Sequence, residues 1–432
     1  MKKGITISLI SVILLYIAFV FQFQHRIEKN NGLGWDGTYY NAIYENFMDD
    51  PSEIVSAKDI NLNKKADITT YKELFKEGAP FNQRIGVPYI ASLLKTDKFS
   101  AFTTINLVCF FIGLISLLYK WKVKNGIIAL IFAFCLLLTP QMPFRLTLFY
   151  PMNVDGVLFL YLCWVICLYN RPLLILILTL SFLPFKEATI LIGVIYFFST
   201  IIYSLFFSGN SFSKEKKKYL WCVSSISVIL AGYIFYRFLL IQYLDINFRD
   251  SGIDTILFWV NKNIFNYTFY IRLLACMFVV FSGYWIFYLK KIIEDKKITH
   301  KFVFIVCLFP FLIFSGTDVT RILCILLPVL LDEILDLNLF GKDYVWITSC
   351  FILFIPLKFP FLILDFKDNY EIGEGFFITQ AEYLRLRYSL FYVAYSLTVL
   401  ILLFSPIFKK HILNHDKIFR PTKNKSSISK RN

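Results

Sequence analysis

Residues 5–23 read ITISLISVILLYIAFVFQF, an uncharged apolar run that follows Lys2 and Lys3. The run is longer than the hydrophobic core of a typical signal peptide, and no small-residue cleavage site follows it in residues 22–26. About 20 apolar residues suffice for a helix to cross the hydrocarbon core of a bilayer. We therefore expect a retained first transmembrane helix at 5–23, with the N-terminus in the cytoplasm.

The rest of the 432-residue chain has the same character. Hydrophobic residues make up 57% and charged residues 17%, against about 45–50% and about 25% in soluble domains, and the mean hydropathy is +0.61. With 18 glycines and 14 prolines, the composition also excludes a collagen-like or low-complexity chain. These values predict a polytopic membrane protein.

The hydropathy pattern predicts an all-α fold of about twelve transmembrane helices in a domain covering residues 1–408. A long first extracytoplasmic loop, 24–98, separates the first helix from the remaining helices of 99–408, and residues 409–432 form a basic cytoplasmic tail. The expected spans are 5–23, 99–119, 126–141, 155–170, 172–185, 187–207, 219–240, 268–289, 302–316, 319–335, 344–364 and 388–406.

The net charge of +15 is explained by the placement of lysine and arginine. Lysines cluster at 120–124, at 214–218 and at 290–291, all on the same expected side of the membrane, as the positive-inside rule requires of cytoplasmic loops. Both termini are then cytoplasmic. The tail can contact anionic membrane lipids, and no nucleic-acid partner is expected.

Motifs for cofactors and metals are missing from the sequence. There is no Walker A, HExxH or GxSxG motif, and residues 32–37 match GxGxxG without the strand that a dinucleotide site needs. The nine cysteines lie in or beside apolar segments without a CxxC pair, which argues against a disulfide framework or a zinc site. We expect no metal site and no cofactor, and a divalent metal requirement stays open.

The first candidate for chemistry is Asp36, in the segment WDGTYY at 35–40. Apolar residues at 40, 43, 44 and 47 have helical spacing, which indicates an amphipathic helix at the membrane surface. Asp36 stands where the N-cap of this helix would be. It is therefore either a plain capping residue or a general base held at the membrane surface.

Further ionisable residues recur at the expected outer face, where a charge near the membrane is costly and therefore suggests function. Each has an ordinary alternative: a helix cap for Asp155, a snorkelling anchor for Arg84, and a solvent-exposed ion pair or turn for Lys186 and Glu187. Asp318 and Arg321 have i, i+3 spacing and are expected to pair. The outer-face candidates are Arg84, Arg145, Asp155, Lys186, Glu187, Asp318 and Arg321.

This arrangement resembles the GT-C superfamily of integral-membrane glycosyltransferases. In that family a carboxylate beside aromatic residues follows the first helix, where Trp35, Asp36, Tyr39 and Tyr40 stand here. A second acid often lies in the next external loop, as Asp155 would, and a basic–glutamate pair follows short middle helices, as at 186–187. The resemblance covers the chain in outline, although the second loop has one aspartate and no large C-terminal domain follows.

The resemblance implies transfer of a sugar from a polyprenyl-phosphate donor to a glycan, lipid or protein acceptor at the extracytoplasmic face. Asp36 would accept the proton of the acceptor hydroxyl, with Asp155 as the second catalytic carboxylate. Fixed cations would stabilise the leaving lipid phosphate, and Arg84, Arg145, Lys186 and Arg321 are the candidates. A shared site requires Asp36, Arg84, Asp155, Lys186 and Glu187 to lie within about one helix diameter of one another, roughly 10–12 Å.

Two rival functions are open. A polysaccharide polymerase of the O-antigen type has similar helices and outer-face arginines, but its large loop is expected later in the chain. A transporter or flippase for lipid-linked sugar predicts charges near the middle of the bilayer, whereas the carboxylates here gather at one expected rim.

Overall fold

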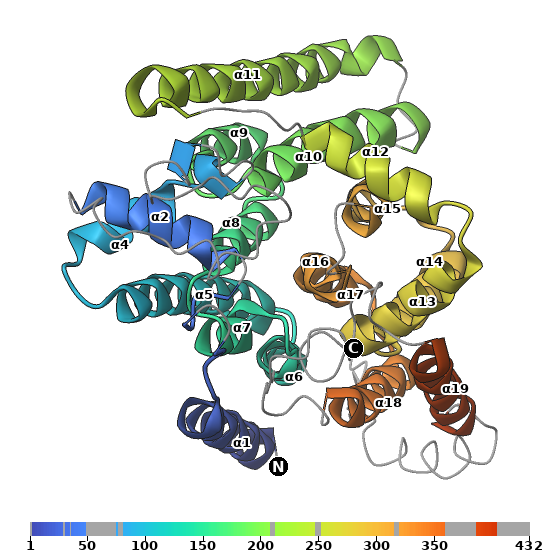
Figure 1. Ribbon diagram of the computed structural model, residues 1–432. Coiled ribbons are helices and arrows are strands. Elements are labelled where there is room, and N and C mark those ends of the chain that lie inside the picture. Colours follow the sequence, from blue (N-terminus) through green and yellow to red (C-terminus); the bar gives the residue numbers. More distant parts are fainter. Residues whose placement is uncertain are drawn as a thin grey trace, which may run out of the picture.

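The computed structural model describes residues 2–28, 31–34, 36–48, 75–76, 81–207, 212–246, 252–314, 319–358 and 386–403. Within these ranges the regular structure is entirely helical (Figure 1), as the sequence predicts. The expected tail at 409–432 lies outside them.

Long helices and helix pairs occupy the expected membrane segments. In the described part of every expected interval there is one helix or one consecutive pair. They are α1 (Lys2–Phe23), α5 (Lys98–Lys122), α6 (Gly126–Leu138), α8 (Asp155–Cys167), α9 (Pro172–Ser181), α10 (Ala188–Phe206), α11 (Phe212–Leu244), α13 (Tyr267–Phe281), α14 (Tyr284–Asp295), α15 (His300–Ile313), α16 (Val319–Leu323), α17 (Leu326–Asp336), α18 (Gly341–Lys358) and α19 (Leu386–Leu403).

Five of the described helical stretches are long and apolar enough to cross a membrane alone, and a sixth is obtained if the pair bent by 108° at 264–266 is one span. The other helices are shorter: α8 has 13 residues, α9 has 10 and α15 has 14. About 20 helical residues span a 30 Å core, which is why these helices do not qualify by length.

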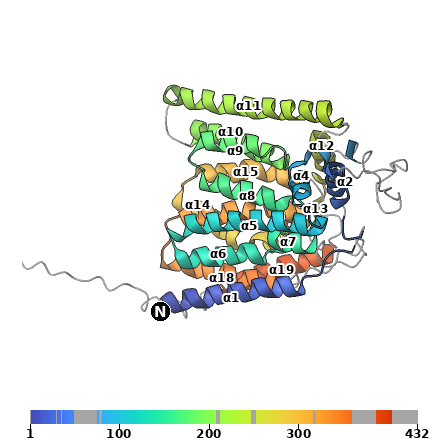
Figure 2. The same cartoon turned by 90° about the vertical axis from the view of Figure 1, so that its left-hand side faces the viewer.

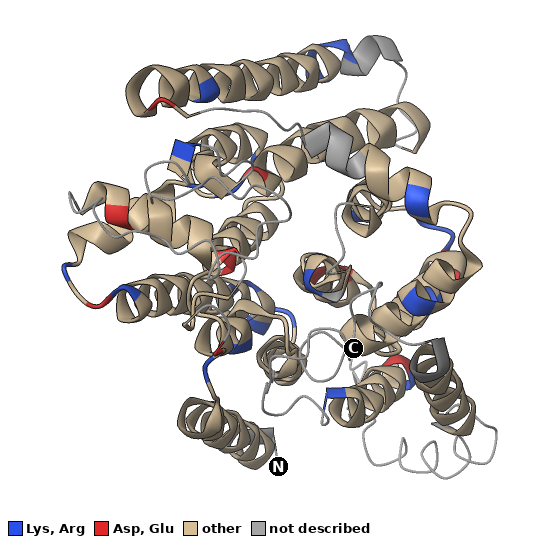
Figure 3. Ribbon diagram, in the orientation of Figure 1, with Lys and Arg blue, Asp and Glu red and all other residues tan. Residues whose placement is uncertain are grey.

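Exposed apolar side chains show which medium surrounds the helices. On α1, Leu15 is 71% exposed, and on α11, Ile234 is 68% exposed. Most of the helical ribbon carries neither acidic nor basic residues (Figure 3). Apolar patches this extensive are not stable in water, whereas helices satisfy their own backbone hydrogen bonds in lipid. The chain is therefore a helical membrane protein.

The helices outside the expected membrane segments collect at one end of the bundle. They are α2 (Gly37–Phe47), η1 (Phe81–Gln83), α4 (Gly86–Leu93), α7 (Pro143–Phe149) and α12 (Gly252–Asn263). Figure 2 shows α2, α4 and α12 at the end opposite the N-terminus of the chain. We call this the α2 end, and the opposite one the N-terminal end.

The amphipathic helix expected after Asp36 is present as α2. Tyr40, Ile43 and Tyr44 are buried, and Phe47 packs against the core. The ring of Phe47 contacts that of Tyr89 on α4 at a centroid distance of 5.2 Å. The apolar face of α2 therefore anchors it on the bundle, which fixes the position of the residues that precede it.

An ion-pair network closes the N-terminal end. The carboxylate of Asp332 on α17 is buried and accepts hydrogen bonds from Trp121 Nε1 (2.8 Å), Lys120 Nζ (2.8 Å) and Lys301 Nζ (2.6 Å). Lys124 pairs with Asp336 in the same region. The sequence explains these lysines only as signals of topology, and the structure shows that they also join α5, α15 and α17.

Candidate functional site

Asp36 occupies the N-cap position of α2, but its side chain forms no capping hydrogen bond. Its carboxylate instead lies 3.7 Å from Arg321 Nη1. The side chain is 26% exposed, which makes it more accessible than the other carboxylate bound to Arg321. The position expected from the sequence is confirmed, and the alternative of a plain cap does not fit the geometry.

Asp155 is the first residue of α8 and lies between two cations. Its Oδ2 accepts hydrogen bonds from Arg321 Nε at 2.9 Å and Nη2 at 2.5 Å, and its Oδ1 pairs with Lys186. The Asp155 side chain is only 9% exposed. It therefore acts as an ion-pair centre rather than as the helix cap that the sequence also allows.

The backbone around Asp155 is held by asparagine side chains. Asn153 Oδ1 accepts from the Asp155 amide at 2.9 Å, and Asn106 Oδ1 on α5 accepts from the Gly156 amide at 2.9 Å. A Cβ on residue 156 would lie 2.3 Å from the Asn106 carbonyl oxygen, so only glycine permits this approach of α8 to α5. These contacts fix where the Asp155 carboxylate projects.

Arg84 and Glu187 form a second ion pair beside the first. Arg84 Nε donates to Glu187 Oε2 at 2.7 Å, and Arg84 Nη1 donates to the Tyr40 hydroxyl on α2 at 2.6 Å. Burial disfavours the guanidinium, but Glu187 and Tyr40 outweigh it and raise the pKa of Arg84. Burial likewise disfavours the carboxylate, but Arg84 outweighs it and lowers the pKa of Glu187.

The adjacent residues Lys186 and Glu187 therefore do not pair with each other. Lys186 turns to Asp155 and Glu187 turns to Arg84, so the short connection between α9 and α10 links the two ion pairs. The five residues of the expected shared site, Asp36, Arg84, Asp155, Lys186 and Glu187, thus lie together at the α2 end, joined by direct contacts and by Arg321 and Tyr40.

Tyr150 belongs to this cluster, although the sequence does not single it out. Its hydroxyl accepts a hydrogen bond from the amide of Gly37 at 2.6 Å. Its ring lies against Gly34, which has a φ of +68°, and a Cβ there would be 2.5 Å from the ring. The GxGxxG match therefore has a packing reason: glycine allows the segment carrying Asp36 to lie on Tyr150.

Tyr39 borders this cluster through Phe81, which also lies against Arg84, whereas the other candidates lie apart from it or outside the described residues. The ring of Tyr39 stacks on Phe81 at 4.8 Å, and burial raises its pKa to about 12. Arg145 is buried beside the end of α6, where Nη1 donates to the Leu138 carbonyl at 3.0 Å. Trp35 and Asp318 lie outside the described residues. The expected pairing of Asp318 with Arg321 therefore lies outside them as well.

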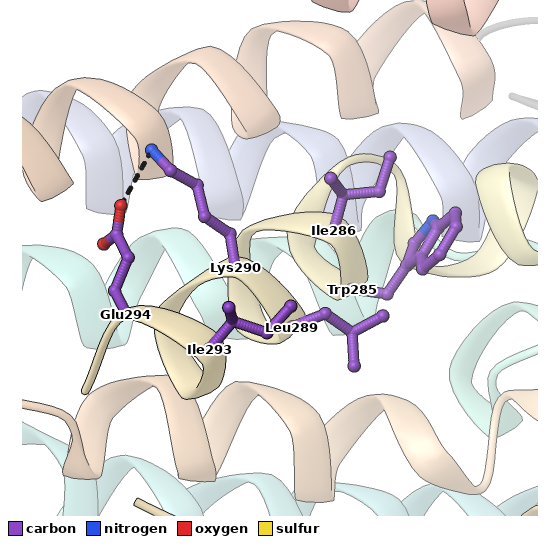
Figure 4. A pocket seen from close by; sticks show the side chains of 6 residues that line it. All are labelled: Trp285, Ile286, Leu289, Lys290, Ile293 and Glu294. Atoms are coloured by element: carbon purple, nitrogen blue, oxygen red, sulfur yellow. Dashed lines mark ion pairs between the residues drawn. The ribbon is translucent and has the colours of Figure 1, made fainter. Parts of the chain in front are cut away.

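A pocket on the bundle lies away from the α2-end cluster and is lined mostly by apolar side chains (Figure 4). Its lining side chains all come from α14, which lies toward the N-terminal end in Figure 2, and Lys290 there pairs with Glu294 at 3.5 Å. The lining residues are Trp285, Ile286, Leu289, Lys290, Ile293 and Glu294. It contains none of the candidate site residues.

Among the described residues there is no group of three or more histidine, cysteine or acidic side chains that could hold a metal ion. No family model, curated protein or solved structure matches this chain. The chemistry of the α2-end cluster is therefore argued from its own geometry.

The Arg84–Glu187 pair predicts a pH-dependent stability. Because the pKa of Glu187 is lowered on folding, the pair stabilises the protein fully above the ordinary glutamate pKa of about 4.3 and loses this contribution as the pH falls through the folded value. The difference in unfolding temperature between wild type and Glu187→Gln should be largest near pH 6 and shrink toward pH 3. A difference that is constant over this range would contradict the assigned ion pair.

Proposed function

We propose that the chain is a membrane glycosyltransferase of the GT-C type, which transfers a sugar from a polyprenyl-phosphate donor to a glycan, lipid or protein acceptor. The observation that supports this most is the convergence of Asp36, Asp155 and Arg321 at the α2 end. These residues come from three distant segments, and none of their contacts is explained by helix capping. Ionisable groups gathered at the edge of a membrane domain suggest chemistry there.

The two aspartates suit different roles. Asp155 accepts from two cations through both oxygens, which makes it a poor proton acceptor and a good positioning group for Arg321 and Lys186. Asp36 has only the 3.7 Å contact with Arg321 among the ion pairs of the described residues, and it is more exposed. Asp36 is therefore the better general base for an acceptor hydroxyl that attacks the anomeric carbon.

The proposed topology is the one that the placement of lysine and arginine in the sequence predicts. All twelve expected intervals cross a bacterial cytoplasmic membrane, the short and broken helices included, and both termini are cytoplasmic. Broken helices are tolerated inside a membrane where neighbouring helices surround them. The α2 end then faces the extracytoplasmic space, where a lipid-linked sugar donor presents its head group.

Cysteine labelling tests this topology. Thr96, between α4 and α5, and Val123, after α5, are both exposed and lie at opposite ends of α5. In intact cells a membrane-impermeant maleimide should label Thr96→Cys, and should label Val123→Cys only after permeabilisation. The parent protein, with its nine native cysteines, is the control for background labelling. The reverse pattern would place the α2 end in the cytoplasm and remove the proposed reaction.

A transfer assay tests the function itself. Membranes with and without the protein would receive radiolabelled polyprenyl-phosphate sugar, and labelled acceptor would be measured. Transfer of single sugars that depends on the protein is the expected result. Joining of whole lipid-linked repeat units would instead indicate a polymerase, and movement of the donor across the membrane without transfer would indicate a transporter.

A further inference from the structure

Two buried cations in the described part of the chain have no carboxylate partner. The buried basic side chains there are Arg84, Arg145, Lys291, Lys301 and Lys358. Three of them form ion pairs: Arg84–Glu187, Lys291–Asp343 (3.1 Å) and Lys301–Asp332 (2.6 Å). No described carboxylate lies within ion-pair distance of Arg145 or Lys358. A buried charge without a partner is costly. Arg145 and Lys358 would therefore be stabilised by a negatively charged group beside them.

Arg145 on α7 is fully buried, with 0% exposure. Its Nη1 donates to the Leu138 carbonyl at 3.0 Å, while Nε and Nη2 have no hydrogen-bond partner. The nearby hydroxyl of Tyr16 donates to the Leu137 carbonyl at 3.4 Å. A guanidinium carries five N–H donors, so most of its capacity is unused.

Lys358 is the last residue of α18 and is 1% exposed. Its ammonium donates one long hydrogen bond of 3.4 Å, to the Val280 carbonyl, and lies 4.6 Å from the ring centroid of Phe354. α18 packs against α6, where the rings of Phe351 and Phe134 lie 6.2 Å apart, and Lys358 and Leu138 are the last residues of these two helices. Two like charges thus share one buried region between α6, α7, α13 and α18.

Helix ends balance only part of this charge. Leu138 is the last residue of α6, and Val280 lies in the last turn of α13. A helix C-terminus carries about −0.5 elementary charge, so two of them supply about −1 against the +2 of Arg145 and Lys358. About one positive charge is left, which an anion would neutralise.

We propose that Arg145 and Lys358 together bind the phosphate group of a lipid. A guanidinium binds phosphate oxygens in a two-pronged geometry and an ammonium adds a point charge. The site lies among membrane helices and beside aromatic groups such as Phe354, which suits a phosphate that carries a hydrocarbon chain. In contrast, the cations of the α2-end cluster are already paired with carboxylates.

The occupant is either a polyprenyl phosphate or an ordinary anionic phospholipid. Its assignment as the donor or product carrier rests on the proposed function, whereas lipid-phosphate binding does not. Full-length protein in nanodiscs of neutral lipid would be titrated with decaprenyl phosphate, decaprenol, phosphatidylglycerol or inorganic phosphate. Binding would be followed by native mass spectrometry and by the unfolding temperature.

We expect decaprenyl phosphate to bind and to raise the unfolding temperature, and decaprenol to do neither. Arg145→Gln and Lys358→Met should each weaken binding at least tenfold, while Lys358→Met should unfold at the same or a higher temperature without lipid. Lys291→Met is the matched control: it removes a buried but paired lysine and should leave the affinity unchanged.

Three results would overturn the site: equal binding of decaprenol, inorganic phosphate binding as tightly as the lipid, or unchanged affinity in both variants. The comparison of decaprenyl phosphate, decaprenol and inorganic phosphate uses the wild-type protein alone. It therefore tests the site even if a variant fails to fold. Equal competition by phosphatidylglycerol would keep the site and identify the occupant as bulk lipid. Lipid-phosphate binding without sugar transfer would remove the proposed function alone.

Discussion

Asp36→Asn is expected to lower sugar transfer by about 10²–10⁴-fold, the usual contribution of a general base. The asparagine has the same shape but cannot accept the proton of the acceptor hydroxyl at neutral pH. Folding should be little affected, because the Asp36 carboxylate has only a 3.7 Å contact with Arg321, which keeps its closer partner Asp155. The measurement is the initial rate of label transfer in membranes with matched protein levels.

Glu45→Gln is the control for this experiment. Glu45 lies on the same helix α2 and forms an ion pair with Lys98 at 3.2 Å, apart from the Asp36–Arg321–Asp155 contacts. Transfer by this variant should stay within about twofold of wild type, as a change outside the site implies. If Asp36→Asn transferred at the wild-type rate, Asp36 would not be the base, whatever the reaction is.

Asp155→Asn is expected to destabilise the protein by about 3–5 kcal/mol, because it leaves Lys186 and Arg321 without the carboxylate that they share. The side chains of all three residues are largely buried. The free energy of unfolding can be measured in mixed micelles by titration with a denaturing detergent, followed by tryptophan fluorescence. Transfer should fall as well, because Arg321 would lose the group that orients it toward Asp36.

An exposed ion pair provides the comparison. Asp245, which is 80% exposed, pairs with Lys76, and Asp245→Asn should cost at most about 1 kcal/mol. The double variant Asp155→Asn/Lys186→Met should recover part of the lost stability, since Lys186, whose ion-pair partner among the described residues is Asp155, is then gone as well. If Asp155→Asn lowered the free energy of unfolding by no more than Asp245→Asn does, Asp155 would not be the residue that holds the site together.

The sequence predicted the features that depend on local patterns. The apolar runs located the helices, and the spacing of Tyr40, Ile43 and Tyr44 predicted α2, because a helix repeats every 3.6 residues. It also placed Asp36 directly before that helix. These predictions hold because they need only the order of residues along one element.

The sequence did not predict which residues of distant segments form ion pairs with each other. Neighbours in the chain suggested an interaction between Lys186 and Glu187, yet each pairs with a residue more than 30 positions away. Tyr150 was missed because nothing local distinguishes it. Lys358 was missed although it stood inside an expected apolar span, where any lysine deserves a functional hypothesis.

The order of residues alone determined that this chain is helical and lies in a membrane, since apolar length and composition decide how a segment partitions between water and lipid. Only the tertiary structure decided which carboxylate meets which cation, and which cations meet none. The physical reason is that the energy of a buried charge depends on the groups within a few ångströms of it, and in this bundle those groups come from helices far apart in the sequence.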